Sequence, residues 1–360
     1  MSIDRMSKTA VIILNWNGVN HGLIRQYLPS VVKYTRSEDT QVIVADNGST
    51  DASLQVLAEE FPSVRVIALD KNYGFAEGYN RAIKKVSEEE EAPDYVVLLN
   101  DDVRVTPNWI EPLTAYMDSH HHCAGLQPKL LKDFSGLAGM TAPDQDYFEY
   151  AGACGGYLDN LCYPYCRGRI FDQVEEDHGQ YDLPAGEAWP VMWATGACLM
   201  VRTQAYLQAG GLDHRFFAHM EEIDLCWRLR RMGYELVCVP QSKVYHKGGA
   251  SLPQGNPKKT NFRNSLVMMW KNLPAEHCNR KILKRKLLDG VAALNFLVHG
   301  EFKQVWAINQ AHREASKMIR TQYTASELVG FGKAPVFKQE KISILFQFYL
   351  RNKKRYSEIF

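Results

Sequence analysis

The sequence predicts an α/β protein in which a mainly parallel central sheet is flanked by helices, followed by a helical C-terminal extension. Three observations support this fold class. Short, largely apolar runs alternate with helical patterns over residues 8–118, as in a parallel sheet covered on both faces. Acidic residues directly follow several of these runs. The last hundred residues change to longer helical patterns that are rich in Lys and Arg.

The strands and helices of the first part can be placed one by one. Each expected strand is a run of five or six mainly apolar residues, too short for a helix of ordinary length. Each expected helix repeats its apolar residues every three or four positions. The expected strands are 10–14, 41–45, 64–69 and 95–99, and the expected helices are 23–34, one from near 51, and 78–86.

The remainder of the chain divides into three stretches. Residues 119–190 are rich in Gly, Tyr and Cys without sustained periodicity, which predicts short antiparallel strands and loops. Residues 192–202 predict a small-residue turn and a strand, 222–232 a helix, 258–325 amphipathic helices and 341–356 a last basic helix. We therefore expect a unit over 1–255, with halves at about 8–118 and 119–255, and a basic helical extension over 256–360.

Composition excludes some classes of protein. The 360 residues are 46% hydrophobic and 23% charged, as is ordinary for a globular protein. The N-terminus has no signal-peptide pattern, and no run approaches the ~18 apolar residues of a membrane-spanning helix. These features predict a cytoplasmic protein.

Charge is distributed unevenly along the chain. Residues 251–360 hold 20 Lys and Arg against 7 Asp and Glu, or +13, and the rest of the chain is −12. Such asymmetry predicts that the extension meets an anionic surface, and basic amphipathic helices can lie on anionic lipid. Helices packed on the first unit with solvated basic faces explain the pattern about as well. The basic residues do not interleave with a nucleic-acid motif, so we expect no nucleic-acid partner.

Two acids, Asp101 and Asp102, end an apolar strand in YVVLLNDDV. Charges at that position are costly unless they bind something. One carboxylate could hold a divalent cation, Mg²⁺ or Mn²⁺, while the other accepts a ribose hydroxyl. The plainer interpretation is a turn in which Asp102 or Thr106 caps a helix beginning at Pro107. Capping explains one acid well and two poorly.

A third acid, Asp46, follows the neighbouring expected strand. In DNGSTD such an acid is usually structural. The carboxyl ends of neighbouring parallel strands open into one crevice, however, so Asp46 could accept a hydrogen bond from a nucleotide base or ribose. The loop from Asn72 to Asn80 includes Gly74, where backbone could approach a ligand closely. Its glycine spacing is not that of a dinucleotide-binding fingerprint.

Two further polar segments lie later in the chain. Glu221, Glu222 and Asp224 open a helix, where acids are favoured by the helix dipole. A carboxylate in a pocket there could equally act as a general base. His246 is followed by Lys247 and two glycines. A lone histidine is most often a satisfied structural residue, but neutral imidazole is also a common metal ligand.

Taken together, these segments resemble the family 2 glycosyltransferases, and most closely bacterial rhamnosyltransferase-like members that build surface polysaccharide. The resemblance runs over about residues 8–251 in the order of the family, and the ordered set is far more specific than any single motif. The matching segments are VIILNWNG, VIVADNGSTDAS, NYGFAEGYNRAI, YVVLLNDDVRV, LQPKLL, WATGACLMVRTQAY, GGLDHRFFAHMEEIDLCWRLRRMGY and VYHKGGAS.

The resemblance implies the GT-A fold of nucleotide-diphospho-sugar transferases, an inverting reaction and an acceptor that is a glycan or lipid-linked sugar. It further implies that Asp102 and His246 bind Mg²⁺ or Mn²⁺, and that Glu222 is the general base. The nucleotide would border Asn15, Asp46, Asn72, Gly74, Asn80 and Asp101, and the donor sugar would border Thr195, Gly196 and Ala197.

Two positions depart from the family pattern. Asn100 replaces the first aspartate of the Asp-x-Asp metal motif. Glu222 replaces an aspartate and is one methylene longer, so that the base could be Glu221 or Glu222. Two other classes stay open: a sugar-phosphate nucleotidyltransferase, which would carry a glycine-rich loop with a basic residue after the first strand, and a nucleotide-sugar-binding protein without activity.

Overall fold

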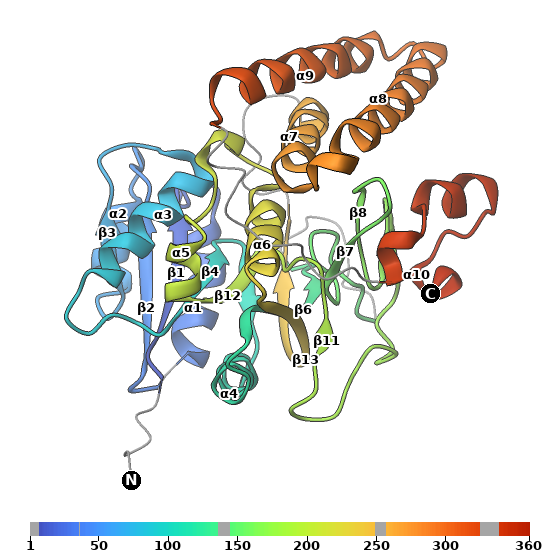
Figure 1. Ribbon diagram of the computed structural model, residues 1–360. Helices are drawn as coiled ribbons and strands as arrows, with labels where there is room; N and C mark the ends of the chain where they lie inside the picture. The colour runs from blue at the N-terminus through green and yellow to red at the C-terminus, as the bar shows by residue number, and fades with distance from the viewer. Residues whose placement is uncertain (1–6, 36, 136–144, 249–256, 325–337) are drawn as a thin grey trace.

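The computed structural model describes residues 7–35, 37–135, 145–248, 257–324 and 338–360. A nine-stranded sheet forms its centre (Figure 1), in the order β11-β13-β6-β12-β4-β1-β2-β3, with β5 paired to β13. Its strands are β1 (Thr9–Asn15), β2 (Thr40–Asp46), β3 (Arg65–Ala68), β4 (Tyr95–Asn100), β5 (Val103–Val105), β6 (Cys123–Lys132), β11 (Trp189–Pro190), β12 (Cys198–Arg202) and β13 (Glu235–His246).

The predicted, mainly parallel sheet is confirmed. β1 pairs in parallel with β2 and β4, β2 with β3, and β6 with β13. β12 lies between β4 and β6 and is antiparallel to both, and the short β5 and β11 run antiparallel to β13. The carboxyl ends of the six parallel strands and the amino end of β12 therefore lie at the same edge.

Helices cover both faces of the sheet, because alternate strand residues point to opposite sides. Ile12 of β1 packs into one core with residues of α3 and α6, whereas Val11 and Ile13 pack into the other with residues of α1 and α4. The helices that cover the two faces are α1 (Leu23–Tyr34), α2 (Ser53–Glu60), α3 (Gly74–Ser87), α4 (Glu111–Ser119), α5 (Thr203–Gln208) and α6 (Glu221–Arg231).

Residues 119–190 are partly as predicted. A small antiparallel sheet has the order β10-β9-β8-β7, with β7 (Gly156–Leu158), β8 (Pro164–Cys166), β9 (Arg169–Ile170) and β10 (Gln173–Val174). The prediction missed β6, a ten-residue strand of the central sheet. Its Gln127, Pro128 and Lys129 hide the strand pattern although they are buried.

The extension forms three long helices, α7 (Pro257–Asn272), α8 (Ala275–Val298) and α9 (Phe302–Thr321). α7 is part of the main core, because Leu266, Val267, Met268 and Met269 are fully buried there. α8 and α9 form a hairpin that projects from the body at the top of Figure 1. Across the described ranges, no helix is both long and apolar enough to cross a bilayer.

The single helix predicted over 341–356 is wrong. The chain forms a 3-10 turn (Lys338–Lys341), a π-helical turn (Phe346–Leu350) and α10 (Tyr356–Ile359). Asn352 has a positive φ of 53° and interrupts the helical path. The ring of Tyr356 then packs beside the rings of Tyr157 and Tyr165, at centroid distances of 6.3 and 6.4 Å. Tertiary packing thus overrides the local helical pattern.

Candidate functional site

The predicted site residues gather along one edge of the sheet. Asn15, Asp46 and His246 are the last residues of β1, β2 and β13. Asp101 and Asp102 follow β4, and the turn from Thr195 to Ala197 leads into the antiparallel β12. The backbone N–H of Asn100 donates to the carbonyl of Ala197 at 3.0 Å, joining the end of β4 to that turn.

Asp46 and Asn15 form one corner of this edge. The side-chain amide of Asn15 donates to Asp46 Oδ2 at 2.8 Å, and the backbone N–H of Ser49 donates to Oδ1 at 2.9 Å. Asp46 is fully buried, whereas Oδ1 of the buried Asn15 has no hydrogen-bond partner among the described residues. The pair holds the turn after β2 and leaves one acceptor to be satisfied.

The loop before α3 is shaped by Asn47, which the sequence analysis did not single out. Its amide donates to Asn72 Oδ1 and to the carbonyl of Gly74, both at 3.0 Å, and its Oδ1 accepts from the N–H of Tyr73 at 3.0 Å. Gly74 opens α3 with a φ of +77°, a conformation that costs glycine little. Asn72 and Gly74 therefore form a fixed bend beside Asp46.

Asn80 links two segments of the protein. Its Oδ1 accepts from the hydroxyl of Tyr206 at 2.6 Å and from the N–H of Leu212 at 3.0 Å, and its amide donates to the Leu212 carbonyl at 2.7 Å. These bonds engage both ends of the side chain. Contact between Asn80 and a nucleotide remains a prediction, and the role seen here is to tie α3 to the loop after α5.

Asp102 and His246 meet at the centre of the edge. Nε2 of His246 lies 3.0 Å from Oδ1 of Asp102, and Nδ1 lies 3.4 Å from Oε2 of Glu149. All three side chains are buried. Glu149 lies in the irregular middle region, where no sequence pattern marked it. The alternative in which Asp102 caps a helix from Pro107 is wrong, because β5 follows at Val103 and α4 begins only at Glu111.

The two carboxylates control the charge of His246. Burial alone would lower its pKa, but Glu149 and Asp102 outweigh that effect and raise the pKa to about 10. Burial in turn works against ionisation of Asp102, yet the pairing with His246 keeps the pKa of Asp102 below its ordinary value. The two carboxylates therefore favour a positive charge between them, which either a protonated His246 or a bound cation with neutral His246 would supply.

The turn from Thr195 to Ala197 is anchored from β6. The buried Gln127 accepts a hydrogen bond from the N–H of Thr195 at 2.9 Å, and Thr195 Oγ1 accepts from the N–H of Ala197 at 3.2 Å. A Cβ placed on Gly152 would lie only 2.8 Å from the side chain of Thr195. The turn is thus held closely from two sides, and Gln127 is a second residue that the sequence did not mark.

Glu222 lies against this turn. A Cβ built on Gly196 would be 3.5 Å from Cβ of Glu222 and 3.4 Å from the ring of Phe75. The start of α6, the start of α3 and the turn therefore converge. Burial raises the pKa of Glu222 to about 7, although backbone N–H groups at the start of α6 lower it.

Glu221 is more buried than its neighbour, at 5% exposure, and one of its carboxylate oxygens has no hydrogen-bond partner among the described residues. Burial, with the charge of Glu222, raises its pKa well above the ordinary value. Burial therefore disfavours the charged form of both carboxyl groups, and the differences between their surroundings suit them to different roles.

The segment before Glu221 has an unusual backbone. Phe217, His219 and Met220 have positive φ values of 66°, 71° and 74°, which are costly for residues with side chains. The side-chain amide of Asn264 in α7 donates to the carbonyls of Phe216, Ala218 and His219 at 2.8–3.0 Å. A residue of the extension thus holds the loop that presents the two glutamates.

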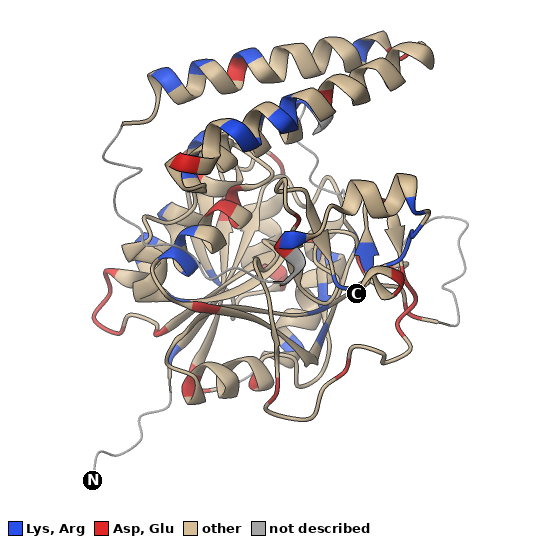
Figure 2. Cartoon of the chain, turned by 45° about the vertical axis from the view of Figure 1, so that its right-hand side comes forward, with Lys and Arg blue, Asp and Glu red and all other residues tan. Residues whose placement is uncertain are grey.

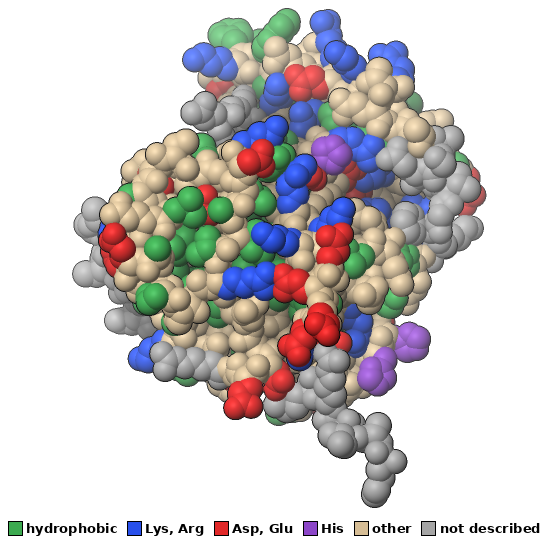
Figure 3. All heavy atoms as spheres, turned by 90° about the vertical axis from the view of Figure 1, so that its left-hand side faces the viewer, with side chains coloured by type: hydrophobic (Ala, Val, Ile, Leu, Met, Phe, Trp, Pro, Cys, Tyr) green, Lys and Arg blue, Asp and Glu red, His purple; other side chains and the backbone are tan. Residues whose placement is uncertain are grey.

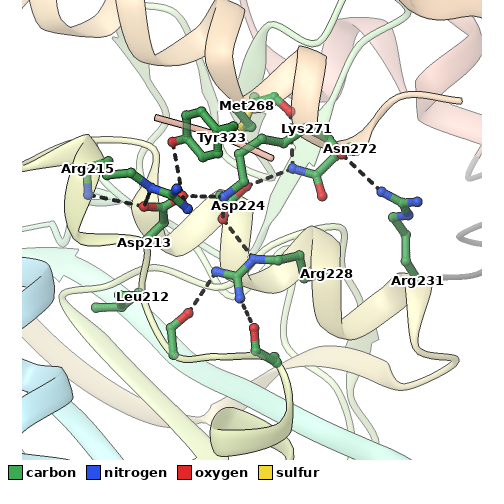
Figure 4. A network of polar contacts seen from close by, with 12 residues as sticks. Leu212, Asp213, Arg215, Asp224, Arg228, Arg231, Met268, Lys271, Asn272 and Tyr323 are labelled. Carbon is green, nitrogen blue, oxygen red and sulfur yellow. Dashed lines mark hydrogen bonds and ion pairs between the residues drawn. The ribbon is translucent and has the colours of Figure 1, made fainter. Parts of the chain in front are cut away.

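A network of charges fixes α6 against α7 (Figure 4). Oδ2 of the fully buried Asp224 lies 2.8 Å from both Arg228 Nε and Lys271 Nζ, and Asn272 donates to Oδ1 at 2.8 Å. Lys271 also contacts Asp213 at 2.6 Å. Asp224 is therefore part of the scaffold, which separates it from Glu221 and Glu222 on the same helical turns.

The residues around Asp102 are suited to a divalent cation only with help from a substrate. Among the described residues, no group of three or more His, Cys, Asp or Glu side chains is arranged to hold a metal ion. Asp102 Oδ1 and His246 Nδ1 are nonetheless buried without aligned hydrogen bonds in the described structure. Mg²⁺ is often held by one or two protein ligands plus phosphates and water. The donor set fits that pattern.

A cavity of about 880 Å³ lies at the other edge of the sheet. Its lining includes Thr9, Thr40, Arg65 and Glu89, from the amino ends of β1, β2 and β3 and the end of α3. It shares none of the residues above. The chemistry-bearing side chains belong to the carboxyl edge, where ligands bind in open α/β sheets.

The parallel sheet with one inserted antiparallel strand, and acids at its carboxyl edge, places the protein in the GT-A class of α/β folds. Residues 10–169 match the family model described as Glycosyl transferase family 2. The chain therefore contains a family 2 glycosyltransferase domain.

Similar curated proteins include several rhamnosyltransferases. An N-acetylglucosaminyl-diphospho-decaprenol L-rhamnosyltransferase of Mycobacterium tuberculosis is 31% identical over 211 residues, which span 57% of this chain and 66% of the relative. The rhamnosyltransferase WbbL of Escherichia coli is 22% identical over 63% of this chain and 81% of its own length. The dTDP-rhamnosyl transferase RfbF of Shigella flexneri is 20% identical, over 68% and 76%.

Two solved structures share the fold. GalNAc-T7 with UDP, GalNAc and Mn²⁺ superposes with a TM-score of 0.56 at 16% identity, over 74% of this chain and 48% of that one. Residues 1–349 of Staphylococcus aureus TarS with UDP-GlcNAc give 0.51 at 16% identity, over 84% and 80%. At this identity the likeness supports the fold, and the chemistry must be argued from the site.

Proposed function

We propose that this protein transfers a sugar from a nucleotide-diphospho-sugar to a hydroxyl group of a glycan or lipid-linked acceptor, with inversion, in surface polysaccharide assembly. One observation carries the proposal: two pairs of residues meet at the same edge of the sheet. Asp102 contacts His246, and Glu222 lies against Gly196. The family 2 domain and the rhamnosyltransferase relatives support it.

The nucleotide would lie over the ends of β1, β2 and β4. Asn15 and Asp46 offer acceptors for a base, the bend at Asn72 and Gly74 borders it, and Asp101 follows the central strand β4. The diphosphate would then approach Asp102 and His246. A divalent cation held there by these two residues would neutralise the charge that develops on the leaving diphosphate.

Glu222 is the general base in this proposal. Its carboxylate takes the proton of the acceptor hydroxyl while the oxygen of that hydroxyl bonds to the anomeric carbon. The bond from the anomeric carbon to the diphosphate oxygen breaks, and its electron pair leaves with the nucleoside diphosphate. A base whose pKa lies near the working pH is ionised in much of the protein and is still basic enough to take the proton. Glu221 is less suited to the role, because burial and the charge of Glu222 disfavour its ionised form.

Thr195, Gly196 and Ala197 would border the donor sugar. The absence of a side chain at Gly196 leaves the space between Phe75 and Glu222 open, since a Cβ there would touch both. We further propose that residues 1–255 hold the catalytic residues and need α7 to complete their core, that the protein is cytoplasmic and that its basic extension over 256–360 contacts the inner membrane surface.

Thermal unfolding with a panel of UDP-, dTDP- and GDP-sugars and Mn²⁺ tests the proposal. One nucleotide class should raise the midpoint, and Asp102→Ala should abolish the shift. The panel should then be followed for release of nucleoside diphosphate. Release of pyrophosphate would indicate a nucleotidyltransferase, and binding without turnover would indicate a non-catalytic protein.

A further inference from the structure

The projecting hairpin of α8 and α9 carries a large exposed apolar surface. On α8 it consists of five side chains that are 60–83% exposed. They recur every three or four positions and therefore share one helical face. They are Leu283, Leu287, Val291, Leu294 and Val298. On α9 the first turn adds Phe302 and Trp306, which are 67% and 59% exposed.

Basic residues extend the same faces toward the body of the protein. Arg280 and Lys284 precede Leu287 on α8 at helical spacing, and both are exposed. On α9, the exposed Arg313, Lys317 and Arg320 follow Trp306 on the same face. Each helix is therefore apolar near the turn of the hairpin and basic near its base. We call residues 287–306 the hairpin tip.

The pictures show this gradient. In Figure 2, Lys and Arg gather on the half of the hairpin that adjoins the body, while most of the distal half is uncharged. Figure 3 shows hydrophobic and basic side chains next to one another on the helices at the top of the molecule. The tip contains one exposed basic residue, Lys303, in the first turn of α9, and one acid, Glu301, in the turn of the hairpin. A second acid, Asp289, is buried beside Arg285 and His312.

We propose that the hairpin tip enters the interfacial layer of an anionic lipid bilayer, with the basic residues of its base against the headgroups. In this position the apolar side chains of the tip are removed from water, and the Lys and Arg side chains of the base contact lipid phosphates. Both ends of the hairpin are therefore in a favourable environment. The inference rests on the proposed function and extends it, since a lipid-linked acceptor would lie in the same surface.

A second copy of the chain is a poorer partner for the exposed surface of the hairpin. If two hairpins packed side by side in parallel, the basic bases would lie together and repel. If they packed antiparallel, the basic base of one copy would cover the apolar tip of the other. An anionic membrane matches both parts of the hairpin, because its headgroups pair with the basic base and its apolar layer accepts the tip.

The test measures co-flotation of the full-length protein with phosphatidylglycerol/phosphatidylethanolamine vesicles and with phosphatidylcholine vesicles. The tip variant combines Leu287→Ser, Leu294→Ser and Trp306→Ser, and should lose at least about tenfold in partitioning because buried apolar area drives interfacial binding. The base variant combines Arg313→Gln, Lys317→Gln and Arg320→Gln, and should lose the preference for anionic vesicles.

The matched control replaces exposed apolar residues on other elements, Leu54→Ser and Leu207→Ser, and should float like the wild type. Circular dichroism and the nucleotide-dependent shift in unfolding midpoint verify that each variant is folded. Unchanged flotation of the tip variant would overturn the inference, as would a wild-type dimer that the tip variant converts to monomer while vesicle binding persists. Flotation is scored separately from turnover, so a protein that floats but transfers nothing contradicts only the proposed function.

Discussion

At the scale of single residues, the chemistry depends on how burial shifts the pKa values of two adjacent glutamates, Glu221 and Glu222. Both pKa values are raised, but that of Glu222 only to about 7. The sequence limited the base to this pair and could not choose between them, because the choice depends on which side chain faces Gly196. Glu149 and Gln127 were missed for the same reason: their partners lie far away in sequence.

Glu222→Gln should lower kcat by roughly 10²- to 10⁴-fold, the usual contribution of a general base, and leave donor affinity unchanged. The measurement is nucleoside diphosphate release with saturating donor and acceptor. Glu221→Gln is the matched control and should retain most of the rate, since burial disfavours the charged form of Glu221. Equal losses in the two variants would contradict the assignment.

The pH profile provides a second test of the same residue. A base acts only when ionised, so kcat should fall about tenfold per pH unit below the folded pKa of about 7 and level off above it. The sign follows from burial, which raises the pKa of a carboxyl group by disfavouring its charged form. A rate that stays constant down to pH 5 would show that no group with this pKa limits turnover.

At the scale of elements, the strands and helices of residues 8–118 follow the sequence closely. The runs at 10–14, 41–45 and 95–99 correspond to β1, β2 and β4 within one residue at each end. β1 and β4 are buried on both faces, so their apolar pattern is unbroken, whereas β2 has the exposed Gln41 near its start and is buried only from Ile43. β6 and the C-terminal turns were not predicted correctly, because their structure depends on partners from other segments.

The role of α7 as a support for the catalytic loop leads to a prediction about Asn264. Asn264→Ala would remove the amide that the carbonyls of Ala218 and His219 accept from, at a cost of about 1–3 kcal/mol each where they are desolvated. The carbonyl of Phe216 would keep its bonds from Arg263 and from the N–H of Ala218. The loop from Phe217 to Met220 should relax, and kcat should fall while the donor KM changes little. Steady-state kinetics together with unfolding midpoints would separate this effect from simple destabilisation.

The matched control is Asn309→Ala on the exposed face of α9, which should behave like the wild type. If Asn264→Ala lowers the unfolding midpoint but leaves kcat intact, α7 contributes stability and does not position the base.

At the scale of the whole molecule, the extension cannot be separated from the catalytic unit as readily as its composition suggests. At residue 251 the net charge of the chain changes from negative to positive, which affects the protein surface. The hydrophobic core does not end there, because it includes the residues from Leu266 to Met269. A chain ending at residue 255 should therefore be aggregated or unfolded by circular dichroism, because the apolar surface under α7 would be exposed. A cooperative thermal transition near that of the full-length protein would refute this expectation.

The reversed direction of β12 has a consequence for how such a protein can diversify. The segments expected to hold the nucleotide end parallel strands in the first half of the chain, whereas the turn at Thr195 begins a strand laid the opposite way and is anchored from β6. Substitutions in this short, separately supported turn could thus alter the preference for one monosaccharide. The residues expected to bind the nucleotide would be left intact. That separation makes residues 195–197 and their anchor Gln127 the natural place to begin engineering a different donor.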